Sequence, residues 1–140
     1  MDMRILRERG FRVLVRVSDT AATLSSSMAT TQKKIRENPS QVKRVVKATM
    51  EGLFYVKEKK KDMIDYIAKK TGAKEDVAKE IYEETVRYYT KDGTVSDKLI
   101  EENIGYARMM GFKINEGFRP SDTYDFCFVE LVKKELGISP

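Results

Sequence analysis

The sequence predicts an α/β domain that is predominantly helical, with about five to six helices and one or two short strands. Its 140 residues fit the size of one domain. Residues 11–17 alternate in a way that is typical of a strand, whereas from residue 31 onward apolar residues recur at helical spacing. We therefore expect residues 1–140 to form a single domain, with a strand-containing segment over 1–30 and a helical part over 31–140.

The expected strand covers residues 11–17, FRVLVRV. Its two faces carry different side chains: Phe11, Val13, Val15 and Val17 on one, and Arg12, Leu14 and Arg16 on the other. Residues 23–30, TLSSSMAT, are interpreted as either a second short strand or a loop. Because an isolated two-stranded ribbon is marginal in water, sheet material is expected either to be missing or to come from another copy. We predict a homo-oligomer with residues 11–30 near the contact.

Start and stop signals divide the remaining chain into helices. Asn38 followed by Pro39 indicates a helix start, because the missing N–H of proline costs nothing at the first helical position. Ser96 is a second candidate cap, and Gly72 and Gly111 are candidate stops. The expected helices cover residues 31–37, 39–56, 58–72, 74–89, 96–111 and 120–137.

The composition excludes several classes of enzyme. The chain has no His, no Trp and one Cys. Mechanisms that depend on imidazole cannot be assembled, a zinc site is implausible, and a disulfide within the chain is impossible. Cys127 is predicted to be a small buried hydrophobic residue and not a nucleophile. We expect no enzymatic activity, no metal site and no cofactor.

The charge balance is mildly basic, with 27 basic and 22 acidic residues and a net charge of +5. Basic side chains cluster in two places: Arg4, Arg7, Arg9, Arg12 and Arg16, and Lys57, Lys59, Lys60 and Lys61. We interpret both clusters as solvated helix ends, with an anion patch as the alternative. No nucleic-acid partner, membrane span or signal peptide is expected, and as written the chain is expected to be cytoplasmic.

The most site-like feature is the run Ser25, Ser26 and Ser27. Hydroxyls and free backbone N–H groups between a strand and a helix can hold a carboxylate, sulfonate or phosphate. These three serines are therefore the candidate ligand-binding residues. The other interpretation of the run is an ordinary polar connection.

From Gly10 onward, several degenerate motifs follow one another in a distinctive order. The segments that carry them are Arg12-Val13-Leu14, Ala29-Thr30, Glu37-Asn38-Pro39 through Ala48, Tyr55 through Gly72, and Asp125 through Gly137. This series resembles the C-terminal part of solute-binding proteins of ABC importers. The nearest group is the nitrate/sulfonate/taurine and thiamine-precursor binding type, which has the type 2 periplasmic-binding fold.

The resemblance implies that the chain is a truncated, partial lobe of a fold in which two α/β lobes close on a solute. It implies a solute-binding component, or a fragment of one, for a small anionic, sulfonate-like or pyrimidine-like solute. The partner would be an ABC permease, no bond chemistry would be involved, and the full-length family is periplasmic or at the cell surface. The alternative is a helical protein-interaction module, with a basic nucleic-acid-binding domain as its less favoured version.

Overall fold

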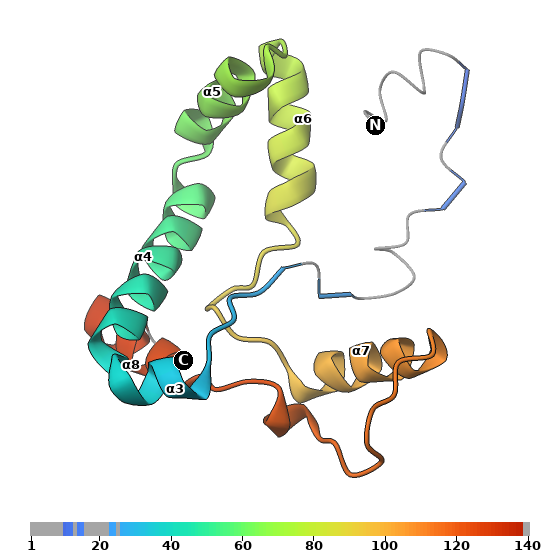
Figure 1. Cartoon of the computed structure of the whole chain (residues 1–140). Coiled ribbons are helices and arrows are strands. Elements are labelled where there is room, and N and C mark those ends of the chain that lie inside the picture. Colours follow the sequence, from blue (N-terminus) through green and yellow to red (C-terminus); the bar gives the residue numbers. More distant parts are fainter. Residues whose placement is uncertain (1–9, 13, 16–22, 25, 139–140) are drawn as a thin grey trace. The chain divides into compact units, whose positions relative to one another are not determined.

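A computed structural model describes residues 10–12, 14–15, 23–24 and 26–138 of the chain (Figure 1). The contacts of these described residues group into two compact units, one within the ranges 28–95 and 123–138, the other within the ranges 10–27 and 96–122. The elements are α3 (Gln32–Glu37), α4 (Pro39–Glu58), α5 (Lys60–Thr71), α6 (Glu75–Val86), α7 (Asp97–Met109), the 3-10 helix η1 (Pro120–Asp122) and α8 (Cys127–Leu136). The fold is thus predominantly helical, as predicted.

The predicted strands are absent from the part of the chain that the structure describes. Residues 11, 12, 14 and 15 have no regular secondary structure, and residues 13, 16 and 17 lie outside the described residues. Phe11 and Val15, predicted for a buried face, are 63% and 64% exposed. A strand needs a neighbouring strand to pair its N–H and C=O groups, and no described segment supplies one. The prediction of one or two strands is therefore wrong for these residues.

Local signals set the beginnings of α3 and α4, and the start of α4 at Pro39 is as predicted. The Thr31 hydroxyl accepts a hydrogen bond from the Lys34 N–H at 3.1 Å and caps α3. Asn38 then separates the two helices, and Pro39 is the first residue of α4. The Asn38 side chain makes no capping hydrogen bond, so the fixed φ of Pro39 is the stronger of the two start signals.

Helices α5 and α6 form a hairpin with its own small core (Figure 1). Ile64, Ala78 and Tyr82 are buried there. Gly72 ends α5 in the left-handed conformation, with φ of 69°, which glycine adopts without strain. The Tyr82 hydroxyl donates a hydrogen bond to the Val56 carbonyl at 2.9 Å, and this contact ties the hairpin to the end of α4.

Helix α8 packs against α4 and begins later than predicted. The predicted helix over 120–137 is interrupted: Pro120–Asp122 is a separate 3-10 helix, and α8 starts at Cys127. The Asp125 carboxylate accepts a hydrogen bond from the Cys127 N–H at 2.9 Å. This bond satisfies one of the first free N–H groups of α8, and such local bonding of Asp favours a helix start over a helix interior.

Helix α7 belongs to the other unit and confirms two predicted signals. Ser96 caps it, accepting a hydrogen bond from the Leu99 N–H at 3.3 Å. Gly111 follows its end with φ of 88°. Ile100 is buried on its inner face, and the Asn103 side chain accepts a hydrogen bond from the Leu24 N–H at 3.0 Å. Residues 23–24 are thereby attached to α7.

Candidate binding groove

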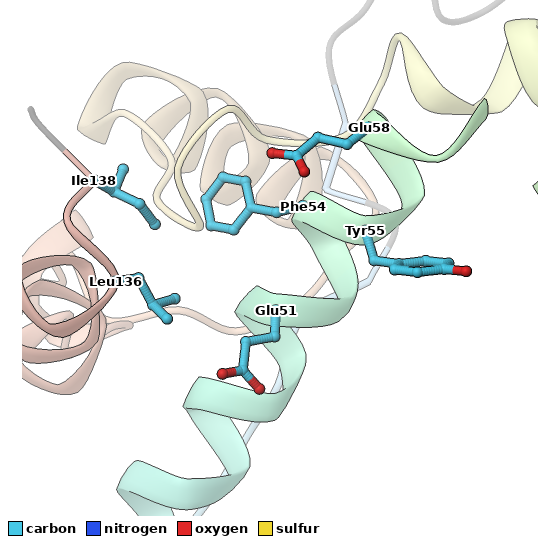
Figure 2. A pocket seen from close by; sticks show the side chains of 6 residues that line it. All are labelled: Glu51, Phe54, Tyr55, Glu58, Leu136 and Ile138. Atoms are coloured by element: carbon cyan, nitrogen blue, oxygen red, sulfur yellow. The ribbon is translucent and has the colours of Figure 1, made fainter.

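A groove of about 460 Å³ lies between one face of α4 and the end of α8 (Figure 2). Four of its six lining residues come from α4, at positions that share one helix face. They are Glu51, Phe54, Tyr55 and Glu58. The other two, Leu136 and Ile138, come from the last residue of α8 and the turn that follows it. The groove therefore depends on the packing of two helices that are far apart in sequence.

The floor of the groove is apolar. The Phe54 ring extends from α4 toward Leu136 and Ile138, which face it from the end of α8 (Figure 2). All three side chains are half-buried. Part of each apolar side chain is therefore in contact with water, and covering that surface with a ligand would favour binding.

A C-terminal capping motif directs Ile138 to this position. Gly137 is left-handed, with φ of 67°. The Ile138 N–H donates to the Lys133 carbonyl at 3.0 Å, and the Gly137 N–H donates to the Lys134 carbonyl at 3.4 Å. This is the Schellman pattern, which reverses the chain at a helix end. It brings Ile138 back beside Leu136.

Two carboxylates border this floor. The side chains of Glu51 and Glu58 extend on the same side of α4 as Phe54, one helical turn before and after it (Figure 2). Both residues are exposed, and neither is paired with any lysine or arginine among the residues that the structure describes. They are therefore available to accept charge-assisted hydrogen bonds from a cationic ligand.

Tyr55 forms the outer rim of the groove and not its floor. Its ring points away from Phe54 (Figure 2), and its hydroxyl donates a hydrogen bond to Asp62 Oδ2 at 2.8 Å. This hydrogen bond and the nearby negative charge raise the pKa of Tyr55. The phenol therefore stays protonated and joins α4 to the first turn of α5.

Ion pairs fix α8 against α4 close to the groove. Glu135 accepts a hydrogen bond from Lys43 and lies 3.8 Å from Lys47 Nζ. The hydrogen bond from Lys43 holds the pKa of Glu135 below its ordinary value. Because Glu135 directly precedes Leu136, these contacts also position the floor of the groove.

The candidate serines lie elsewhere. Ser26 and Ser27 are exposed and have no regular secondary structure, and Ser25 lies outside the described residues. Neither described serine lines the groove. An anion site at this run stays a prediction.

Cys127 is exposed, so the prediction that it is a buried hydrophobic residue is wrong. It is the first residue of α8, and the buried residues of this helix, Val132 and Lys133, come later in it. Its hydrogen bond with the Asp125 carboxylate raises the pKa of the Cys127 thiol. The thiolate, which is the reactive form, is therefore disfavoured.

The lysine cluster that begins at Lys57 is partly engaged in structural contacts. Lys57 donates a hydrogen bond to the Thr90 carbonyl, and Lys60 donates one to Glu83 Oε1 at 2.6 Å. The hydrogen bond from Lys60 lowers the pKa of Glu83. These contacts tie the ends of α4 and α5 to α6 and to the segment after it.

Sequence reasoning missed the groove, whose lining residues carry no motif. Within the described ranges, no helix is long and apolar enough to cross a membrane. No three metal-ligating side chains of these residues lie close enough to share a metal ion. Comparison of the chain with protein-family models, with curated proteins and with solved structures finds no match.

Proposed function

We propose that the chain is a helical protein-interaction module whose groove on α4 binds a basic, apolar segment of a partner protein. One observation carries this proposal: an apolar floor lies between two carboxylates that no described cation neutralises. A segment with an apolar side chain next to an arginine or lysine would satisfy both parts of the groove. The apolar side chain would cover Phe54, and the cation would pair with Glu51 or Glu58.

The shape of the groove favours a protein segment over a small molecule. Small-molecule sites usually enclose most of the surface of their ligand. Here the lining residues come only from one face of α4 and the end of α8. A surface of this kind suits a segment that lays a few side chains against it.

Fluorescence anisotropy with two labelled peptides tests the proposal. One peptide alternates arginine with leucine, and the other alternates glutamate with leucine. We expect the full chain to bind the first and not the second. The double variant Glu51→Gln/Glu58→Gln should bind the first peptide at least about tenfold more weakly, since one charge-assisted hydrogen bond contributes about 1.5 kcal/mol or more.

The matched control is Glu101→Gln, at an exposed carboxylate on α7 outside the groove. It should leave the affinity unchanged. Equal binding of the two peptides, or unchanged affinity of the double variant, would contradict the proposal.

Solute binding is the second candidate function, and the ordered motif series from Gly10 onward favours it. Thermal-shift measurements with taurine, nitrate and a pyrimidine test this candidate. It predicts a higher Tm with at least one of these solutes, and a smaller rise in the variant Ser26→Ala/Ser27→Ala. An unchanged Tm with all three would count against it.

A further inference from the structure

We infer that the groove on α4 is occupied by residues 11–15 of a second copy of this chain. The inference rests on the proposed function and names the partner. The partner copy would contribute Arg12 to a site that already holds Glu58 and Phe54. Self-association would then proceed through a segment of one copy and a groove of the other.

The first argument is that residues 11–15 have the chemistry that the groove requires. Phe11, Leu14 and Val15 are 63%, 82% and 64% exposed. In an extended segment Leu14 shares a face with Arg12, while Phe11 and Val15 lie on the other face. The face that meets the groove therefore carries one large apolar side chain next to an arginine. Arg12 is also exposed. Between residues 9 and 18 the sequence holds three arginines and no acidic residue, so its charge is opposite to that of the groove.

The second argument is the match in spacing. In an extended segment, Arg12 and Leu14 lie on the same side and are about 6–7 Å apart. On α4, Phe54 and Glu58 lie on the same face and are about 6 Å apart along the helix axis. Leu14 can therefore cover the Phe54 ring while Arg12 reaches the Glu58 carboxylate. In this register the segment runs opposite to α4.

The third argument is conformational. Residues 11, 12, 14 and 15 belong to no helix or strand, so binding does not require a helix to unfold. The alternating sequence of residues 11–15, with valine at positions 13 and 15, favours an extended backbone. A symmetric dimer can place the segment of each copy in the groove of the other, and both grooves are then filled.

A charge-exchange experiment tests the inference on the full chain. Sedimentation equilibrium should show a dimer for the natural sequence. The single variants Arg12→Glu and Glu58→Lys each place like charges together, and each should weaken the dimer at least about tenfold in dissociation constant. An equimolar mixture of the two variants should restore the dimer, because every contact between unlike copies again joins opposite charges.

The variants are chosen to preserve the fold. Glu58 is the last residue of α4, where a cation interacts favourably with the helix dipole. Circular dichroism should show natural helix content for both variants. Arg44→Glu and Glu101→Lys make the same charge changes at exposed positions outside the groove, and should leave the dimer unchanged.

If the equimolar mixture of Arg12→Glu and Glu58→Lys stays monomeric, the inference is overturned. The same result is expected if the segment of each copy binds the groove of that same copy. A natural chain that is monomeric but still binds the arginine–leucine peptide would overturn this inference and leave the proposed function standing. A chain that neither dimerises nor binds that peptide would overturn both.

Discussion

Lys133 Nζ lies 2.9 Å from Asp92 Oδ2, and the lysine side chain is only 7% exposed. This ion pair joins the turn that contains Gly93 to α8. A second bond links the same ammonium to Glu130 Oε1 at 3.1 Å. A charge so far removed from water must be paired, because its desolvation is otherwise costly. The pair therefore fixes the position of the turn against the helix.

The Asp92–Lys133 pair should make stability depend on acidic pH. The hydrogen bond from Lys133 lowers the pKa of Asp92 from 3.8 to about 2. Since the folded-state pKa is depressed, the stabilisation is complete above the unfolded-state value and is lost as pH falls through the folded-state value. We expect the free energy of urea unfolding to decrease from about pH 4 to about pH 2.

The comparison for this prediction is the variant Asp92→Asn, which should be less stable at neutral pH and less sensitive to acid. Asp65→Asn, at an exposed position on α5, serves as the control and should follow the natural chain. Parallel pH curves for Asp92→Asn and the natural chain would show that the pair contributes no acid-sensitive stability.

The substitution Tyr82→Phe should lower the free energy of unfolding by about 0.5–1.5 kcal/mol, the usual contribution of one hydrogen bond. The ring would still fill its buried site between α5 and α6, but the bond to the Val56 carbonyl would be lost. Urea unfolding measures the change. Tyr55→Phe removes an exposed hydroxyl and should have a smaller effect, so a larger loss there would contradict this ranking.

Substitution by alanine at two glycines should change the stability of the fold in opposite directions. Gly93 has φ of 86°, and an added Cβ would lie 3.4 Å from Val129 Cγ1, so Gly93→Ala should destabilise the fold. Gly52 lies inside α4 with open space around it. Gly52→Ala should stabilise the fold by about 0.5–1 kcal/mol, because glycine is a poor helix former. The Tm of each variant measures the change. A higher Tm for Gly93→Ala would show that position 93 does not require glycine.

Cys127 should react slowly with a disulfide reagent at mildly alkaline pH, although it is exposed. The reason is the raised pKa that its hydrogen bond with Asp125 produces. The substitution Asp125→Asn should lower that pKa, increase the thiolate fraction and accelerate the reaction. Stopped-flow absorbance gives the rate. An unchanged rate in the variant would mean that Asp125 does not control the thiol.

The helices were predictable because their signals are local. Pro39 and Ser96 each act within one turn of the helix that they begin. Gly72 and Gly137 likewise follow the helices that they terminate, in the left-handed conformation that suits glycine. Each signal depends on the backbone of its neighbours in sequence, and no distant residue has to be known.

The failures concern contacts with distant residues. Alternation over residues 11–17 predicts one strand but does not say whether a second strand lies beside it. The groove is equally hidden in the sequence, because Phe54 and Leu136 meet only after α4 and α8 pack together. Lys133 looked like any surface lysine, since its partner Asp92 is 41 positions away.

Helix α4 is in contact with α3, α5, α6 and α8, which belong to the same unit. It packs with α3 and α8, and its Val56 carbonyl receives the Tyr82 hydroxyl of the α5–α6 hairpin. The hairpin and α8 therefore share α4 as a packing partner, in addition to the Asp92–Lys133 pair that holds the turn after α6 against α8. Loss of α4 structure would remove packing from both at once, so this unit should unfold in one cooperative transition and not helix by helix.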